Sequence, residues 1–281
     1  MKVNFNCSIL DFHKEFCINI HEELLSRGHI SKIATDREIK PDADFTIQPD
    51  EVCKRMGGLG IWINHAFPVI PQNEFYMVDP FKSNLLKNSD YNFTFSQSWA
   101  DWHKIHGLPT KVVGMPKLDK LFGNIEGGHI IYAPTHHRKP DVYSSNIDIS
   151  MLDKYNVVYR GHPAFETDQE TSIESFKKAS IVISDYSSIG LEAIVLNIPT
   201  ILFGHPKWRY KYNHISANAD EATIRVYNNE DLEKAIETYL KDPSYLEGER
   251  LKHSKILCEY QGTSSKRFVD ILEEIWKKQY M

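Results

Sequence analysis

The sequence predicts an α/β protein with two domains, each built on a parallel sheet. Short apolar segments alternate with amphipathic ones along the 281 residues, a glycine-rich stretch at 123–128 interrupts the alternation, and polar turns follow the apolar segments of the second half. Alternation of strands and helices is typical of parallel sheets covered by helices. The length suits two domains of roughly 120 to 150 residues. We therefore expect two Rossmann-like domains, over residues 1–122 and 123–281.

The overall charge argues against nucleic acid as a partner. Lys and Arg number 33 against 38 Asp and Glu, which gives a net charge of -5. A protein with this balance has no general field that attracts a nucleic-acid backbone. A phosphate site in this chain must therefore be local.

The cysteines and the N-terminus indicate a reducing compartment. Cys7, Cys17, Cys53 and Cys258 lie far apart and form no C-x-x-C pair, so neither a disulfide framework nor a zinc knot is expected. The sequence shows no apolar signal core and no run of the ~20 apolar residues that a bilayer crossing needs. We expect a cytoplasmic protein, with a peripheral position at the inner face of the membrane as an alternative.

The first half contains the predicted elements of one domain. Apolar residues recur at helical spacing over 12–27, and Gly28 can end that helix. A glycine turn precedes a predicted strand that ends in Asn64 and His65, a polar pair well placed for chemistry. The other expected elements are strands at 2–6, 30–34, 43–48, 75–78, 92–95 and 110–114 and a helix at 98–106.

In the second half, four successive predicted strands each end in a polar turn. The strands are expected near 129–134, 157–160, 181–183 and 199–203, and the turns carry Thr135 to Arg138, Gly161-His162-Pro163, Ser184 to Ser188, and Gly204-His205-Pro206. Ligands of open α/β sheets bind at the carboxyl ends of the strands, where such turns lie. Two later helices are expected at 231–240 and 264–276.

The third of these turns is the strongest candidate for an anion site. Ile181 to Ile183 form an apolar strand, Ser187 and Ser188 follow, and an apolar helix then runs until shortly before Pro199. Helix N-termini combine free N–H groups with the positive end of the helix dipole, so they bind phosphate. Ser and Asp are also ordinary N-cap residues, which leaves a purely structural role open.

Several motifs in order and spacing resemble one known family. They are Asp119 after Gly114-Met115-Pro116, Tyr132 to Thr135 with Arg138, Gly161-His162-Pro163, Ser184 to Ser188, Asn197-Ile198-Pro199, and Gly262 to Arg267. Over residues 114 to about 270, the chain is similar to the CDP-glycerol glycerophosphotransferases of teichoic-acid synthesis. The resemblance implies a GT-B-like fold, with two Rossmann-like domains facing a central cleft and a C-terminal helix that crosses back toward the first domain.

The first half departs from the family pattern. Members of that family carry Trp-His-Gly-Thr-Pro where this chain has Asn64-His65-Ala66-Phe67-Pro68. The histidine is kept, whereas Ala66 and Phe67 replace small or polar neighbours. The sequence therefore does not identify the acceptor or the transferred group.

Two histidines are candidates for the catalytic roles that transfer from a nucleotide-activated donor requires. The acceptor hydroxyl must lose a proton, and the charge growing on the leaving phosphate must be stabilised. The resemblance implies that His65 is the general base and that His162 contacts the donor phosphate or the transferred group. On the residues alone, each histidine has a structural role as the alternative.

The remaining candidate residues would bind the donor. Ser187 and Ser188 would hold the pyrophosphate, and Thr135 would add a hydroxyl. Arg138 and Arg267 are candidate charge clamps, because a guanidinium binds phosphate with two parallel hydrogen bonds. Glu192 can meet a ribose or donor hydroxyl, or it is a solvated carboxylate on a helix face.

No cofactor or metal is expected, and the donor nucleotide, linked through CDP or UDP, is itself a substrate. His136 and His137 beside His162 have no carboxylate or cysteine at ligand spacing, which argues against a metal site. The basic and aromatic segment 207–212 suits a membrane interface, a polyanionic acceptor or bases to stack on, and a solvated loop over the cleft is the structural alternative.

The sequence therefore predicts a transferase that moves glycerol phosphate or a related group from a CDP-activated donor to an acceptor hydroxyl. The acceptor would be a polyol phosphate or glycan, with a lipid-linked form at the membrane surface as one version. A glycosyltransferase that uses a nucleotide sugar, a nucleotide-sugar epimerase, and a non-catalytic nucleotide-binding module are the alternatives.

Overall fold

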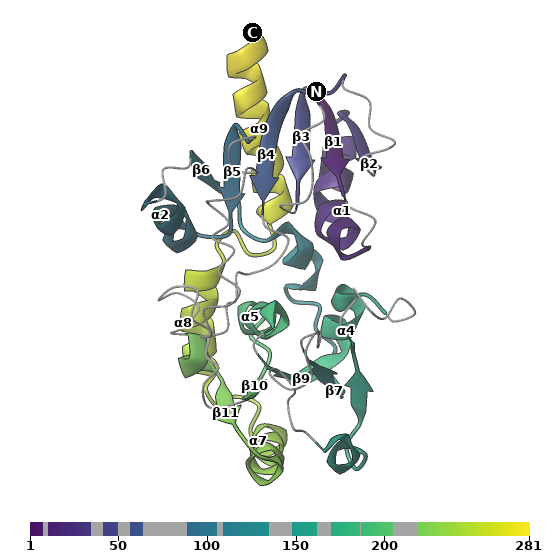
Figure 1. Cartoon of the computed structure of the whole chain (residues 1–281), viewed down its shortest axis with the longest axis vertical. Coiled ribbons are helices and arrows are strands. Elements are labelled where there is room, and N and C mark those ends of the chain that lie inside the picture. Colours follow the sequence, from purple (N-terminus) through teal and green to yellow (C-terminus); the bar gives the residue numbers. More distant parts are fainter. Residues whose placement is uncertain are drawn as a thin grey trace. The chain divides into compact units, whose positions relative to one another are not determined.

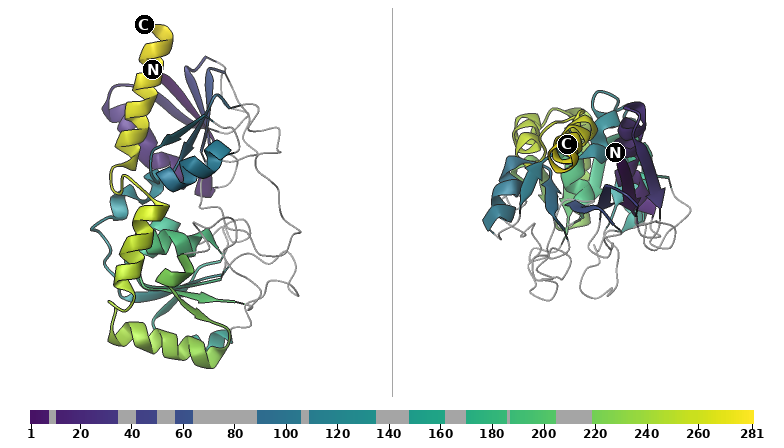
Figure 2. Two further views of the ribbon diagram at one scale, coloured as in Figure 1. Left: turned by 90° about the vertical axis from the view of Figure 1, so that its left-hand side faces the viewer. Right: turned by 90° about the horizontal axis from the view of Figure 1, so that it is seen from above.

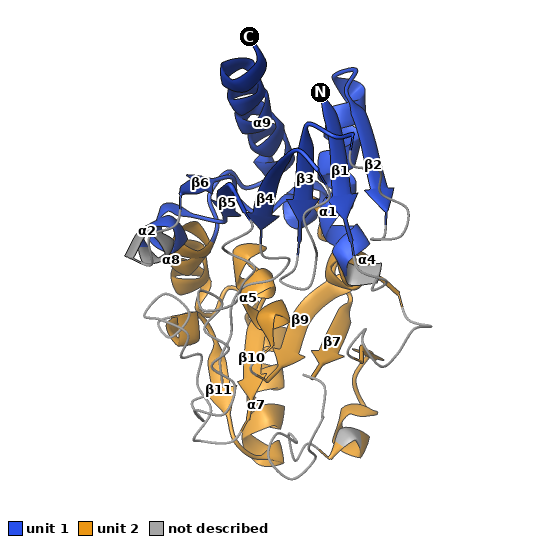
Figure 3. Ribbon diagram, turned by 45° about the horizontal axis from the view of Figure 1, so that its top comes forward, with its two compact units in different colours: residues 1–65, 78–120, 258–281 blue, residues 66–77, 121–257 orange. Residues whose placement is uncertain are grey.

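The computed structural model describes residues 1–7, 11–34, 42–49, 57–63, 89–105, 109–134, 148–161, 170–185, 187–204 and 219–281 (Figure 1). The chain divides into two compact units (Figure 3). Unit 1 comprises Met1–His65, Val78–Lys120 and Cys258–Met281, and unit 2 comprises Ala66–Met77 and Leu121–Leu257.

Unit 1 contains a six-stranded parallel sheet in the order β2-β1-β3-β4-β5-β6. Its strands are β1 (Lys2–Asn6), β2 (Ile30–Ala34), β3 (Phe45–Gln48), β4 (Leu59–Ile63), β5 (Tyr91–Thr94) and β6 (Thr110–Val112). Its helices are α1 (Asp11–Ser26), α2 (Gln97–Ile105) and α9 (Ser264–Tyr280), and the 3-10 helix η3 (Pro116–Leu121) ends at the boundary with unit 2.

The sheet of unit 1 is buried because helices pack on it. Phe45 and Ile47 of β3 and Ile61 of β4 are fully buried, as expected for central strands of a parallel sheet. Helix α9 buries one apolar stripe, and its Phe268 ring lies 4.8 Å from the ring of Phe93 in β5. Helices α1 and α9 also pack against each other (Figure 2).

A cluster of ion pairs, here called the α1–α9 cluster, joins the turn directly after α1 to α9. Arg27 Nη1 lies 2.8 Å from Asp270 and 3.5 Å from Glu273, and Nε2 of His29 lies 2.9 Å from Glu273. The last 24 residues, 258–281, therefore belong to unit 1, whereas the predicted second domain, 123–281, included them. The physical reason is that the apolar stripe and the acidic groups of α9 have their partners in the first unit.

Acid should weaken this α1–α9 cluster. Burial alone would raise the pKa of Asp270, but hydrogen bonds from Lys266 and Arg27 outweigh it and leave the pKa below its usual value. The hydrogen bond from His29 lowers the pKa of Glu273. Because both pKa values are lower in the folded state, the unfolded chain binds more protons, and the stabilisation present above pH 4.5 is lost as the pH falls through the folded pKa values.

Urea unfolding measured at pH 6 and pH 3.5 tests this expectation. Arg27→Met should lower stability by about 1 kcal/mol at pH 6, because the pairs are partly exposed, and by less at pH 3.5. Lys234→Met in unit 2, which removes an exposed pair with Glu230, is the matched control. An Arg27→Met effect that is equal at both pH values would contradict the expectation.

Unit 2 contains a five-stranded parallel sheet in the order β11-β10-β9-β7-β8. Its strands are β7 (His129–Ala133), β8 (Val157–Tyr159), β9 (Ala179–Ser184), β10 (Thr200–Phe203) and β11 (Ile224–Val226). Its helices are α4 (Ser172–Lys178), α5 (Ser188–Val195), α7 (Asn229–Lys241) and α8 (Glu247–Leu257), with 3-10 helices η4 (Ile149–Leu152) and η5 (Ala219–Ala222).

The core of unit 2 lies between this sheet and its helices. Ile183 of β9 and Ile201 of β10 are fully buried and pack with Leu232 and Ile236 of α7. All residues of α5 after Ser188 are buried, which explains why its sequence is apolar on every side. Thr171 and Glu174 form a capping box that begins α4.

Most predicted elements are present in the described residues. The predicted helix 12–27 is α1, the predicted helix 231–240 lies within α7, and the predicted helix 264–276 lies within α9. The elements that were not predicted are α4, α8, β11 and the three 3-10 helices η3, η4 and η5. The strand predicted at 75–78 lies outside the described residues.

The described cysteines are free thiols. Cys7, Cys17 and Cys258 are buried, and burial raises the pKa of the Cys258 thiol to about 12, so it stays protonated at neutral pH. Cys53 lies outside the described residues. In the described part of the chain, no helix has both the length and the apolarity that a bilayer crossing requires.

Candidate functional site

The carboxyl ends of the unit 2 strands lie along one edge of its sheet, because all the strands are parallel. Ser184, at the end of β9, is in register with Ala133, at the end of β7, and its hydroxyl donates to the Ala133 carbonyl at 2.9 Å. Asp185 and Ser187 follow β9 at this edge. The polar turn expected to bind an anion is therefore held at the ligand-binding edge of a parallel sheet.

Ser187 is the N-cap of α5. Its φ and ψ are -70° and 150°, and its hydroxyl accepts a hydrogen bond from the Ile189 amide at 3.5 Å. The Ser187 amide donates to Oδ1 of buried Asp185 at 3.2 Å. Asp185 thus fixes the turn, as expected from its charge, which would repel a bound anion.

Ser188 is the first helical residue of α5 and is partly exposed. Within the described residues, its amide and hydroxyl donate no hydrogen bond. Both donors lie at the positive end of the α5 dipole. The arrangement can therefore bind a phosphate oxygen with groups of unit 2 alone.

Glu192 lies one turn further along α5 and is 2% exposed. The alternative that its carboxylate is a solvated group on a helix face is therefore wrong. A buried carboxylate is costly unless it receives hydrogen bonds. The sequence could not show this burial, because it depends on how α5 packs between the sheet and α8.

Arg160 is a further charged residue at the same edge of the sheet. It directly follows β8, its amide donates to the Tyr132 carbonyl at 2.8 Å, and its side chain is buried with 7% exposure. Arg160 was not among the site residues predicted from the sequence. The available signal was an arginine at the end of a predicted strand, directly before the Gly-His-Pro turn.

Four of the predicted site residues lie outside the described residues, namely His65, Thr135, Arg138 and His162. The same holds for His136, His137 and the segment 207–212. Their proposed roles remain predictions.

Arg267 belongs to unit 1, on the second turn of α9, whereas Ser187, Ser188 and Glu192 belong to unit 2. The N-terminus of α9 already holds an internal carboxylate, because the amides of Ser264 and Ser265 donate to Asp119 at 2.9 and 2.6 Å. Burial raises the pKa of Asp119, and these hydrogen bonds oppose the rise. Asp119, part of the family-like motif after Gly114, therefore has a structural role as the cap of α9.

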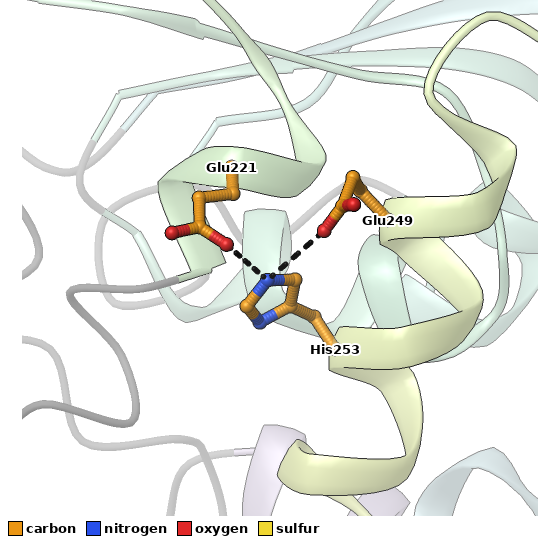
Figure 4. Close-up of side chains that lie close together, drawn as sticks. All are labelled: Glu221, Glu249 and His253. Carbon is orange, nitrogen blue, oxygen red and sulfur yellow. Dashed lines mark hydrogen bonds and ion pairs between the residues drawn. The ribbon is translucent and has the colours of Figure 1, made fainter.

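Glu221, Glu249 and His253 form the one group of possible metal ligands found among the described residues (Figure 4). Nε2 of the buried His253 lies 3.2 Å from Glu221 and 3.7 Å from Glu249. Lys252 lies 3.3 and 2.9 Å from the same two carboxylates and already supplies a positive charge. Nδ1 of His253 is buried without a hydrogen-bond acceptor, whereas metal-bound histidines usually have one. The cluster is therefore best described as an ion-pair network that joins η5 to α8.

Comparison with known proteins shows similarity to enzymes of teichoic-acid synthesis. No family model matches the chain. A teichoic acid glycerol-phosphate primase of Staphylococcus aureus (strain NCTC 8325 / PS 47) is 28% identical over 116 residues, which cover 37% of this chain and 31% of the primase. The chain thus matches about a third of the length of this curated relative.

Two solved structures match almost the whole chain. The wall teichoic acid polymerase TagF matches with a TM-score of 0.63 and 14% identity, over 99% of this chain and 89% of that chain. A protein described as a UDP-N-acetylglucosamine 2-epimerase, from Listeria monocytogenes, matches with a TM-score of 0.64 and 11% identity, over 99% and 97% of the two chains. These similarities confirm the predicted GT-B-like α/β fold class, and the first supports the resemblance found in the sequence.

Proposed function

We propose that this chain is a nucleotide-dependent transferase that moves glycerol phosphate from a CDP-activated donor to an acceptor hydroxyl. The observation that carries the proposal is the opening of α5, where the Ser188 amide and hydroxyl lie at the carboxyl edge of a parallel sheet. The similarity to the primase and to TagF supports this donor, since a TagF variant soaked with CDPG matches this chain with a TM-score of 0.66.

In the proposed complex, unit 2 binds the donor. Ser187, Ser188 and the first turn of α5 hold the pyrophosphate, with Thr135 and Arg138 beside them. Buried Glu192 accepts a hydrogen bond from a ribose or donor hydroxyl. These donors stabilise the charge on the leaving phosphate, so the proposed step requires no metal or cofactor.

The reaction is a substitution at the β-phosphorus of the donor. The acceptor oxygen forms a new P–O bond, the bond between the β-phosphorus and the bridging oxygen breaks, and CMP leaves with that oxygen. His65 takes the proton of the acceptor hydroxyl, and His162 contacts the phosphate that is transferred. The proposed acceptor is a polyol phosphate or glycan, and the proposed compartment is the cytoplasm, with a lipid-linked acceptor placing the protein at the membrane surface.

Nucleotide-sugar chemistry and non-catalytic nucleotide binding are the two alternatives to this function. The structural similarity to the epimerase supports nucleotide-sugar chemistry as an alternative, either a glycosyl transfer or an epimerisation, and buried Glu192 is a carboxylate that such chemistry can use. A non-catalytic nucleotide-binding module is a third possibility. It predicts that His65→Ala leaves every measurable function intact.

Product analysis with CDP-glycerol and with UDP-linked sugars separates these functions. Release of CMP with a glycerol phosphate adduct on the acceptor is the expected result, and His65→Ala should lower its rate at least about 100-fold. Release of UDP or CDP would indicate glycosyl transfer. Isomerised sugar without transfer would indicate an epimerase, and binding without turnover would indicate the module.

A further inference from the structure

Unit 1 contains a polar pocket of about 510 Å³, and one of its lining residues is Arg267, which the sequence predicts as a charge clamp for the donor. The pocket is lined by residues of α2, β6, the segment before α9, and α9 itself. Its polar and charged lining residues include Gln97, Asp101, Lys111, Glu259, Tyr260 and Arg267. All of them belong to unit 1, so the pocket is complete without unit 2.

The guanidinium of Arg267 has no counter-ion in the described part of the chain. It lies over the ring of Tyr260, with 5.2 Å between the guanidinium carbon and the ring centroid, and its Nε is buried without a hydrogen-bond acceptor. In contrast, Arg27 and Arg225 pair with carboxylates at 2.8 and 2.9 Å. Stacking on an aromatic ring holds a guanidinium plane in place while its donors stay available to an anion.

Lys111 adds a second cation to the pocket. Its side chain is exposed at β6, and no ion pair is found for it among the described residues. The two acidic residues of the pocket are both engaged by Gln97, because Glu259 accepts from the Gln97 amide at 2.5 Å and Asp101 accepts from its side-chain nitrogen at 2.7 Å. Because these carboxylates accept hydrogen bonds from the first residue of α2, the charges of Arg267 and Lys111 are available to bind an external anion.

The backbone of Tyr260 is strained. Its φ is 53°, in the left-handed region that bulky residues avoid, and its side chain is 40% exposed. A glycine would relieve the strain, yet the position carries the ring on which Arg267 stacks. Strained residues of this kind cluster at active sites and ligand-binding sites.

We infer that Arg267, Lys111 and Tyr260 form a phosphate-ester binding site in unit 1. Within the proposed function, on which this assignment rests, the ligand is the phosphate of the polyol-phosphate acceptor. The donor pyrophosphate is bound by α5 of unit 2, and an acceptor that carries its own phosphate needs a second anion site. The alternative source of the same phosphate chemistry is the donor itself, for which the sequence predicts Arg267 as a charge clamp.

Calorimetric titration of the whole chain with glycerol phosphate, and separately with CDP, tests the inference. Arg267→Gln should weaken glycerol phosphate binding about tenfold or more, through loss of charge-assisted hydrogen bonds, and leave CDP binding unchanged. Lys111→Gln should weaken the same binding severalfold, and Lys241→Gln, an exposed lysine of α7, is the control and should change neither. Tyr260→Gly should weaken glycerol phosphate binding while raising or maintaining the unfolding temperature, which a purely structural tyrosine would not do.

The outcomes separate this inference from the proposed function. Unchanged glycerol phosphate binding in both Arg267→Gln and Lys111→Gln would overturn the site. Loss of CDP binding in Arg267→Gln, with glycerol phosphate binding intact, would overturn the acceptor assignment and show that Arg267 binds the donor. Glycerol phosphate binding that depends on Arg267 in a chain that binds no CDP would support the site and count against the proposed donor.

Discussion

Ser188→Asp is expected to weaken CDP binding about 100-fold or more without loss of stability, because a carboxylate there repels the diphosphate that α5 is proposed to hold. Ser188 is the first helical residue of α5 and is partly exposed, so an aspartate fits without disturbing the core. A carboxylate in the first turn interacts favourably with the helix dipole, by about 0.3 to 1 kcal/mol. Binding and stability should therefore change in opposite directions.

The matched control is Asn229→Asp, which adds the same charge at the first residue of α7 in the same unit. It should leave CDP binding unchanged. Ser188→Ala, which removes the hydroxyl but adds no charge, should weaken binding only severalfold. The measurements are calorimetric titration with CDP and thermal unfolding of each variant. Wild-type affinity in Ser188→Asp would show that the opening of α5 is only a structural cap.

The turn around Ser188 could be predicted from sequence because its signals are local. An apolar strand, serines at the helix start and Pro199 after the helix all lie within one short stretch, and the observed β9 and α5 follow them. The burial of Glu192 could not be predicted, since it depends on contacts of α5 with β9, β10 and α8. The sequence thus predicted the serine turn at the start of α5, but it did not predict that the Glu192 carboxylate is buried.

Helix α8 and strand β11 were missed for identifiable reasons. The buried residues of α8 include Arg250 and His253, so its sequence lacks an apolar stripe. Arg250 is satisfied by Asn197 and by the carbonyls of Pro243 and Tyr245, which lie outside the helix. Strand β11 has only three residues. Helices and strands are recognised in a sequence by an apolar periodicity of sufficient length. Helix α8 lacks the periodicity, and strand β11 lacks the length.

The assignment of α9 to unit 1 shows a different limit. Its apolar stripe was recognised, but a stripe does not say which surface it covers. The partners are Phe93 and the α1 cluster around Arg27, more than 170 residues earlier in the chain. The family resemblance implied that the C-terminal helix crosses back toward the first domain, but the residues alone did not, because the charges of Asp270 and Glu273 match many partners at such a sequence separation.

Gly114→Ala is expected to lower the stability of unit 1 by about 3 kcal/mol or more, through backbone strain and a steric clash together. The φ of Gly114 is 82°, and an added Cβ would lie 2.3 Å from both the Glu259 carbonyl oxygen and the Ser264 hydroxyl. These atoms cannot move freely, because Asp119 binds the amides of Ser264 and Ser265 at the start of α9. Relief of the clash would therefore displace the N-terminus of α9 or break its cap.

Gly123→Ala separates the clash from the strain. Gly123 has a φ of 77°, close to that of Gly114, but no atom lies within 4 Å of its added Cβ, so the substitution should cost only about 1 kcal/mol. Because Gly114 belongs to unit 1 and Gly123 to unit 2, urea unfolding is followed by far-ultraviolet circular dichroism, which reports on the helices of both units. Equal losses in the two variants would mean that α9 is not held against Gly114. A larger loss for Gly114→Ala, accompanied by faster hydrogen exchange in the first turn of α9, would identify the Asp119 cap as the contact that positions this helix.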